Sequence, residues 1–219
     1  MLRLLFEKKG NGIWISHLDL MRLFQRSFQR AGLPLEHSQG FNPRPMVSIA
    51  LPMSVGVESS CELLDFDLTG EIPSKAEIAQ RLNDALVPGV RVLEVYEQGR
   101  KVRDLAWLHA QVDLEYDKGV PREAQEQIRQ LFARQCLPVE KKGKNGPSDQ
   151  DIIPLLHTLE LRRNDDNTLC LDAVVSAQNP ALNPMQLAKA VEKYLPDLAF
   201  DFAKSRRLEV YDKDMQIFR

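Results

Sequence analysis

The hydrophobic and polar positions in the first half of the chain follow two different periods. Four segments carry an apolar run or an alternation of period two, which predicts strands: 1–7, 46–51, 61–68 and 90–96. Two segments between them carry apolar positions at helical spacing. Each opens with a capping-box pattern, Ser16 with Asp19 and Ser74 with Glu77, and Gly32 is expected to end the first helix. The predicted order is therefore strand, helix, strand, strand, helix, strand.

The second half of the chain predicts the same order without residue-level identity to the first. Strands are expected at 105–116, 151–163, 168–177 and 207–211, and helices at 122–135 and 184–194. A short segment at 137–140 predicts one more strand before a polar loop at 141–148. Each half thus predicts the β-α-β-β-α-β order of a ferredoxin-like unit. We predict an α+β fold of two such units, each an antiparallel sheet with helices on one face.

A polar stretch without periodicity, at 97–103, separates the two halves. We predict an N-terminal ferredoxin-like domain at 1–98 and a C-terminal one at 104–219. The length of 219 residues and the hydrophobic share of 43% are sufficient for two such cores. Apolar runs stay well short of the roughly 18–20 residues of a transmembrane helix. The N-terminus also lacks the apolar core of a signal peptide, so we expect a cytoplasmic protein with no membrane partner.

The three cysteines, Cys61, Cys136 and Cys170, are widely spaced and lie beside apolar residues. An odd number without a CxxC pair predicts reduced, buried thiols and argues against a structural zinc site. The sequence also lacks the clustered cysteines that hold an iron–sulfur cluster. We therefore expect no metal and no cofactor in this chain.

The net charge of −2 conceals an uneven distribution. Residues 1–50 carry seven basic and three acidic side chains, whereas residues 51–100 carry four basic and nine acidic ones. Acidic residues that alternate with apolar ones predict the solvated face of a strand and not a metal cluster: Glu58, Glu62, Asp65, Asp67 and Glu71. An anionic partner is therefore expected to meet the first fifty residues.

The first predicted helix carries Arg22, Arg26 and Arg30 at successive i, i+4 positions, opposite its apolar face. Guanidinium groups along one face can bind successive phosphates, because each offers a planar fork of donors. Gln25 and Gln29 lie beside them. The alternative is an ordinary solvated helix face.

The loop at 37–45 combines an aromatic residue, a basic residue, a glycine and two prolines. Phe41 offers a face for base stacking, Arg44 a charged fork and Asn42 an amide. The glycine permits unusual backbone angles, and the prolines stiffen the segment. Together with the arginine-bearing helix, this loop predicts a surface for single-stranded RNA or a nucleotide. The alternative is a structural turn with Phe41 in the core.

His17, at the start of the first helix, is the one candidate for a general base. Packing or capping of the first turn is the alternative reading of this side chain. His109 and His157 fall in predicted strands and are expected to be structural. The sequence contains no phosphate-binding P-loop, no dinucleotide-binding glycine motif, no HExxH and no GxSxG.

Four motifs stand out in this half of the chain: ISHLDLMR at 15–22, RAGLP at 30–34, GFNPRP at 40–45 and VGVES at 55–59. With these motifs the chain resembles the radical SAM-linked protein family, bacterial domains that occur alone or joined to the C-terminus of a radical SAM protein. The resemblance implies association with a separate radical SAM enzyme and no defined reaction. Arg44 stands where many members carry histidine, which argues against a metal ligand or proton-transfer group there.

These observations predict a non-catalytic accessory or substrate-binding module for a radical SAM enzyme. The residues expected to bind RNA or another anion are Arg22, Arg26, Arg30, Phe41, Asn42 and Arg44. One alternative is a metal-independent RNA-processing enzyme, with His17 as base and Arg22 or Arg44 stabilising the transition state. The paired ferredoxin-like layout looks like that of the CRISPR repeat-processing endoribonucleases, a likeness of fold alone. Another alternative is a scaffold that binds only protein.

Overall fold

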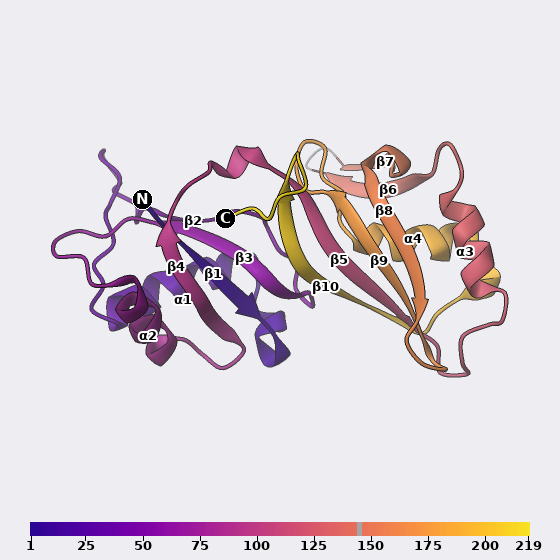
Figure 1. Ribbon diagram of the computed structural model, residues 1–219, viewed down its shortest axis with the longest axis horizontal. Coiled ribbons are helices and arrows are strands. Elements are labelled where there is room, and N and C mark those ends of the chain that lie inside the picture. Colours follow the sequence, from indigo (N-terminus) through magenta and orange to yellow (C-terminus); the bar gives the residue numbers. More distant parts are fainter. Residues whose placement is uncertain (144–145) are drawn as a thin grey trace. The chain divides into compact units, whose positions relative to one another are not determined.

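The computed structural model describes residues 1–143 and 146–219. The chain forms two compact units (Figure 1). Unit 1 comprises Met1–Asp104 together with the last two residues, Phe218–Arg219, and unit 2 comprises Leu105–Ile217. The two units are distinguished by their internal contacts, which do not show that either one can fold by itself, as a domain can. The division into two domains therefore stays a prediction.

Unit 1 is a four-stranded antiparallel sheet with two α-helices. Its elements are β1 (Leu2–Lys8), η1 (Gly10–Trp14), α1 (His17–Arg30), β2 (Val47–Ile49), β3 (Glu58–Phe66), α2 (Lys75–Ala85), β4 (Val90–Glu97) and η2 (Val102–Asp104). The strands lie in the order β4-β1-β3-β2, and each neighbouring pair is antiparallel. This is the arrangement that the predicted β-α-β-β-α-β order produces. The predicted α+β class is confirmed.

The core of unit 1 lies between the sheet and the two helices. Phe6 of β1 meets Phe24 of α1 edge to face, with ring centroids 4.8 Å apart, and the rings of Phe28 and Phe66 are 4.9 Å apart. All four side chains are fully buried. Ile78 and Leu82 of α2 belong to the same buried core, so both helices cover the same face of the sheet, as predicted.

Local signals set the ends of α1 and α2. The Ser16 hydroxyl accepts a hydrogen bond from the Asp19 backbone N–H at 3.2 Å, and Ser74 accepts one from Glu77 at 3.2 Å. Gly32, with a φ of +65°, follows the end of α1 in the left-handed region that glycine tolerates best. The two predicted helix starts, capped by Ser16 and Ser74, and the predicted helix end are confirmed.

Unit 2 repeats the strand order of unit 1 and adds a hairpin. Its elements are β5 (Leu105–Glu115), α3 (Ala124–Phe132), β6 (Pro138–Gly143), β7 (Gly146–Asp151), η3 (Ile153–Leu155), β8 (Leu156–Arg163), β9 (Thr168–Ser176), α4 (Met185–Tyr194), η4 (Pro196–Leu198) and β10 (Phe202–Asp212). The main strands lie in the order β10-β5-β9-β8, all antiparallel. Helix α4 packs on β5 and β10, and α3 packs beside β8 (Figure 1).

The predicted loop at 141–148 is wrong in part. Strands β6 and β7 pair through most of it, with Lys141 opposite Ser148, and residues 144–145 lie outside the described residues. Backbone hydrogen bonds hold such a ribbon and do not require apolar side chains. The predicted strand at 137–140 is the first part of β6, whereas the polar composition of the segment concealed the rest of β6 and β7.

The predicted solvated face of β3 is also wrong, because Glu62 and Asp65 are buried. Asp65 lies directly opposite Arg3 of β1 and accepts hydrogen bonds from its Nε at 2.6 Å and its Nη2 at 2.9 Å. The Phe218 ring lies 5.2 Å from the Arg3 guanidinium. A partner 62 residues away in the sequence thus makes burial of this carboxylate tolerable.

The thiols differ from expectation at one position. Cys61 and Cys170 are buried, as predicted, but Cys136 is exposed. Cys136 lies between the end of α3 and the start of β6, where the chain turns at the surface. Its apolar neighbour Leu137 is buried, which shows that an apolar neighbour does not determine on which side of the backbone a thiol lies.

Candidate nucleic-acid interface

Helix α1 places its three arginines in three different environments. Arg22 donates to the Asp19 carboxylate at 3.1 Å. Arg30 donates to the backbone carbonyl of Ala85 at 2.6 Å and to Ser27 Oγ at 3.2 Å, so it closes the C-terminal end of α2. Arg26 is exposed and makes no hydrogen bond or ion pair within the described part of the chain. Of the three guanidinium groups, Arg26 is the one most available to a ligand.

The loop that carries Phe41 is closed by a short backbone ladder. His37 and Pro45 form an antiparallel bridge, and the Ser38 N–H donates to the Arg44 carbonyl at 2.8 Å. The Arg44 N–H in turn donates to Ser38 Oγ at 3.0 Å. These contacts define the stem of the loop and leave its tip pointing away from the core.

The tip of this loop exposes all three side chains that were selected from the sequence. Phe41 is fully exposed, with a relative exposure of 106%, and Asn42 and Arg44 are exposed as well. The alternative in which Phe41 lies in the core is therefore wrong. A fully exposed phenylalanine adds nothing to the core and is available for stacking.

A groove of about 460 Å³ lies between α1 and the stem of the loop. We call it the α1–loop groove, and its lining residues are Gln25, Arg26, Gln29, Leu33, Pro34, Leu35, His37 and Pro45. The structure therefore brings Arg26 of α1 and the stem of the Phe41 loop to one hollow. Arg30 lines a different hollow, with Arg81 and Asp84 of α2.

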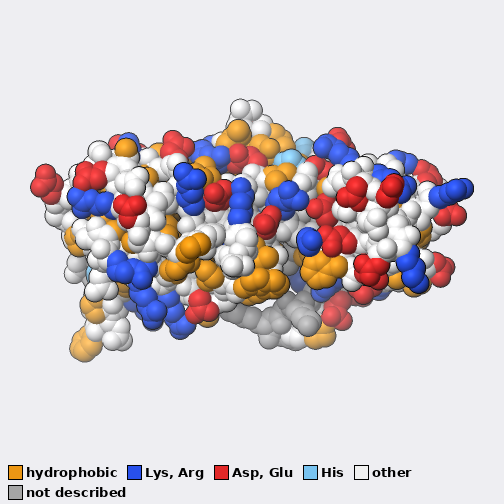
Figure 2. Space-filling view, turned by 90° about the horizontal axis from the view of Figure 1, so that it is seen from below, with side chains coloured by type: hydrophobic (Ala, Val, Ile, Leu, Met, Phe, Trp, Pro, Cys, Tyr) orange, Lys and Arg blue, Asp and Glu red, His pale blue; other side chains and the backbone are white. Residues whose placement is uncertain are grey.

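Positive charge is visible on one side of unit 1. Figure 2 shows Lys and Arg side chains gathered at the lower left of the face in view, and a segment projecting there ends in a hydrophobic side chain. Such a combination of cationic and apolar surface is typical of single-strand binding surfaces.

His17 lacks the acidic partner that a general base commonly uses. Its Nδ1 is buried without a hydrogen-bond partner in residues 1–143 and 146–219. The neighbouring Asp19 accepts instead from Ser16 Oγ at 2.7 Å and from Arg22. Hydrogen bonds from Ser16 and then Arg22 hold the pKa of Asp19 below its usual value. Among the residues that the structure describes, no carboxylate is bonded to the His17 imidazole to orient it.

The exposed tryptophan before α1 was not predicted from the sequence. Trp14 has a relative exposure of 64%, and Leu18, the second residue of α1 and four positions further along the chain, is exposed as well. The Gly56 N–H donates to the Ile13 carbonyl at 2.9 Å, so the segment just before the first motif meets the fourth motif here. A large apolar residue two positions before the helix cap Ser16 was the available signal.

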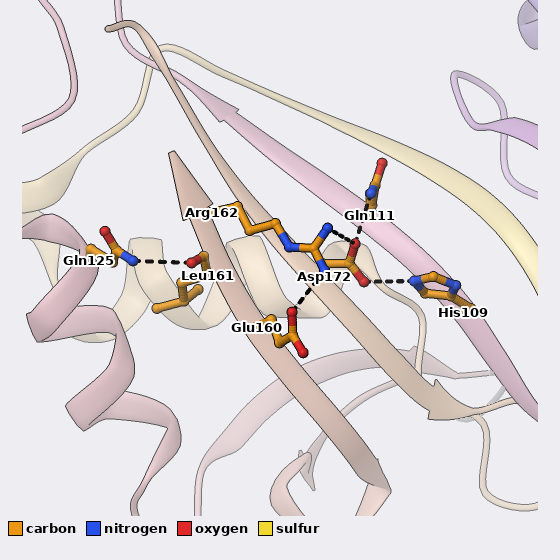
Figure 3. Close-up of polar contacts among 7 residues, drawn as sticks. All are labelled: His109, Gln111, Gln125, Glu160, Leu161, Arg162 and Asp172. Carbon is orange, nitrogen blue, oxygen red and sulfur yellow. Dashed lines mark hydrogen bonds and ion pairs between the residues drawn. The ribbon is translucent and has the colours of Figure 1, made fainter. Parts of the chain in front are cut away.

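Unit 2 holds a different group of polar side chains, centred on Asp172 of β9 (Figure 3). Asp172 accepts from His109 Nε2 at 2.6 Å and from Gln111 Nε2 at 2.8 Å. Arg162 lies 3.7 Å from the same carboxylate and also pairs with Glu160 at 2.8 Å. We call these five residues the Asp172 cluster.

The carboxylate at the centre of this cluster is held ionised. Burial raises the pKa of Asp172, but hydrogen bonds from Gln111 and His109 outweigh that effect, so the pKa lies below its usual value. His109 is therefore bonded, as expected for a structural histidine. In the same view, Gln125 of α3 donates to the Leu161 carbonyl of β8 at 3.1 Å, apart from the cluster (Figure 3).

The thiol nearest the Asp172 cluster is not suited to nucleophilic chemistry. Burial, followed by hydrogen bonding to Asp113, raises the pKa of Cys170 to about 12. Among the described residues, no group of three or more His, Cys, Asp or Glu side chains is arranged to hold a metal ion. No helix in the described ranges is long and apolar enough to cross a membrane.

Solved structures give remote likenesses only. A crystal structure of a Cbf5–Nop10–Gar1 complex matches with 9% identity and a TM-score of 0.49, covering 95% of this chain and 48% of that one. The archaeal box H/ACA sRNP Nop10–Cbf5 complex matches with 10% identity and a TM-score of 0.44, covering 94% and 46%. The chain thus spans about half the length of these proteins. Because both TM-scores are below 0.5, the description of the fold rests on the strand order of this chain and not on these likenesses.

Sequence comparison supplies the family. The search of curated proteins gives no significant match. A family profile described as "Uncharacterized protein conserved in bacteria (DUF2344)" matches residues 1–184, which include all of unit 1 except its two C-terminal residues. The profile covers far more than half of the chain, and the chain therefore belongs to this conserved bacterial family.

Proposed function

We propose that the chain is a non-catalytic substrate-binding module that holds single-stranded RNA on the surface made by α1 and the Phe41 loop. The observation that carries the proposal is that the unbonded Arg26 lines the same groove as His37 and Pro45, the stem of the loop that carries the fully exposed Phe41. A stacking face and a phosphate-binding group are the two elements that single-strand recognition requires.

The remaining residues of the surface have graded roles in this proposal. Arg44 and Asn42, both exposed at the loop tip, would contact a phosphate and a base edge. Arg22 and Arg30 would contribute less than Arg26, because each must give up or share an existing hydrogen bond to meet a phosphate. The four exposed arginines of α1 and the loop favour the approach of a polyanion to this surface: Arg22, Arg26, Arg30 and Arg44.

The proposed enzyme partner rests on the resemblance to the radical SAM-linked protein family. In this reading the chain presents RNA to a separate radical SAM enzyme in the cytoplasm, where its cysteines remain reduced. This proposed partnership is tested by cross-linking in cells, followed by recovery of the RNA and protein bound to the chain. Recovery of RNA together with an enzyme that carries a radical SAM cluster is the expected result. Recovery of protein without RNA would favour a scaffold instead.

A cleavage assay tests the non-catalytic part of the proposal. Pooled single-stranded RNA is incubated with the purified chain and EDTA, and its length is followed on a denaturing gel. We expect intact RNA, because His17 has no carboxylate partner in the described ranges that would orient it as a base. Cleavage that is lost in His17→Ala would replace the binding module by a metal-independent nuclease.

A further inference from the structure

The lining of the α1–loop groove combines two kinds of surface. Leu33 is almost fully buried, and together with Pro34, Leu35 and Pro45 it supplies apolar walls. Gln25, Gln29 and His37 supply hydrogen-bonding groups in the same hollow. A nucleobase has the matching character, because its faces are apolar and its edges carry donors and acceptors. The volume of about 460 Å³ falls within the usual range of small-ligand sites, roughly 300–1,000 Å³.

The two glutamines are placed to act together. Gln25 and Gln29 are four residues apart on α1 and therefore neighbour each other on one helix face. Neither side-chain amide makes a hydrogen bond within the part of the chain that the structure describes. Each offers one donor and one acceptor group, the combination that recognises base edges, whereas a phosphate needs donors alone.

A third polar group in the groove has a fixed orientation. His37 Nδ1 lies 3.0 Å from the Leu35 carbonyl oxygen. A carbonyl oxygen only accepts, so Nδ1 carries the proton and donates. Nε2 of the neutral ring is then an acceptor. Arg26, next to Gln25 in the lining, supplies the cation for a phosphate at the same site.

We infer that the α1–loop groove receives one unstacked nucleobase, whose edge is recognised by Gln25 and Gln29 and whose phosphate meets Arg26. The base belongs to the bound RNA, so in this respect the inference rests on the proposed function. Phe41, at the tip of the loop whose stem lines the groove, would stack the neighbouring base. The surface would then prefer some bases to others, which a purely electrostatic surface does not do.

Titration with mononucleotides tests the groove directly. The four ribonucleoside monophosphates and ribose 5-phosphate are titrated separately onto the full chain by calorimetry. We expect at least one nucleotide to bind about fivefold or more tightly than ribose 5-phosphate, the smallest effect typical of a bidentate base contact. Binding of ribose 5-phosphate as tight as that of every nucleotide would overturn the inference.

The variant Gln25→Leu/Gln29→Leu removes the amides and keeps the helix propensity of α1. We expect it to lose the preference for a base over ribose 5-phosphate while its melting temperature stays unchanged. The matched control is Gln127→Leu, an exposed glutamine of helix α3 in unit 2, which should bind like the unaltered chain. Retention of the base preference in the double variant contradicts the assignment of these two residues.

A third measurement separates failure of this inference from failure of the proposed function. Affinity is compared for a short single-stranded RNA and for the same backbone carrying only abasic sites. Equal, measurable affinity for both would leave RNA binding intact and reject the base site. Nucleotide binding without any RNA binding would retain the base site and reject the RNA surface.

Discussion

Two regions of the molecule carry polar side chains at the surface: the α1–loop groove with its Phe41 loop, and the Asp172 cluster. They differ in whether these side chains already have hydrogen-bond or ion-pair partners within the protein. Phe41 and Arg26 make no hydrogen bond or ion pair through their side chains among the described residues, and both are exposed. Asp172, by contrast, has a side-chain exposure of only 11% and is bonded to His109 and Gln111. The first region leaves its groups available to a ligand, whereas the second uses them within unit 2.

The comparison predicts that the two regions respond oppositely to mutation. An exposed group with no partner can be removed at little cost to the free energy of unfolding, typically within about 0.5 kcal/mol. A bonded, largely buried group leaves its partners unsatisfied when it is removed. Changes in the first region should therefore alter RNA binding alone, and changes in the second should alter stability alone.

The largest effect is expected for Arg3, whose side chain is hydrogen-bonded and fully buried. Arg3→Met leaves the Asp65 carboxylate without its two guanidinium donors and should lower the free energy of unfolding by about 3–5 kcal/mol. Denaturant unfolding of the two proteins measures this difference. A loss below about 1 kcal/mol would mean that burial and bonding do not predict stability in this fold.

A smaller loss of stability is expected within the Asp172 cluster itself. Asp172→Asn removes the charge that His109 and Arg162 face and should cost about 1–3 kcal/mol at neutral pH, with RNA affinity unchanged. Loss of RNA affinity in a variant that remains folded would place the cluster in the binding surface and end the contrast between the two regions.

The acid dependence of stability provides a second measurement on Asp172. Its folded pKa lies below the ordinary value of 3.8, so its stabilising contribution is present above that value and is lost as pH falls through the lower folded pKa. Asp172→Asn should therefore lose less stability than the unaltered chain between neutral pH and the range below about pH 4. Parallel acid-unfolding curves for the two proteins would contradict the assigned direction.

On the α1–loop surface, Phe41→Ala should weaken binding of single-stranded RNA by about 1–3 kcal/mol, with little change in the salt dependence. The free energy of unfolding should remain within about 0.5 kcal/mol of the original, because the ring is fully exposed. Fluorescence anisotropy with labelled RNA and denaturant unfolding measure the two quantities. Phe202→Ala, at an exposed phenylalanine of unit 2, is the matched control.

The smallest effect is expected for Arg26→Ala. Loss of one phosphate contact should weaken RNA binding uniformly across sequences and flatten the plot of log affinity against log salt by about one unit of slope. Arg122→Ala, at an exposed arginine of unit 2, should leave the slope unchanged. An equal change in both variants would indicate a general charge effect and no localised site.

The sequence was sufficient wherever the determining signal is local. The capping serines Ser16 and Ser74 and the terminal Gly32 lie within a few residues of the backbone groups that they affect, so the ends of α1 and α2 could be predicted. Alternating apolar positions likewise predicted the strands of both units, because burial on one face follows the period of the strand. In the mostly polar β6–β7 ribbon, the signal predicted only the first part of β6.

The sequence was insufficient wherever the partner is distant. Burial of Asp65 depends on Arg3, 62 residues away, and the bonded state of Arg30 depends on Ala85, 55 residues away. The sequence could propose but not decide that Phe41 is exposed, because a turn with glycine and proline can hold an aromatic side chain in the core or in solvent. The groove itself arises only when the stem at His37 and Pro45 folds beside α1.

Combined removal of the two unbonded groups tests the RNA surface most directly. The affinity of a short single-stranded RNA and the free energy of unfolding are measured for the unaltered chain and for Arg26→Ala/Phe41→Ala. RNA affinity should fall by roughly tenfold or more, while the free energy of unfolding stays within about 0.5 kcal/mol of its original value. Unchanged RNA affinity in the double variant, or no RNA binding by the unaltered chain, would contradict the proposal that this surface binds RNA.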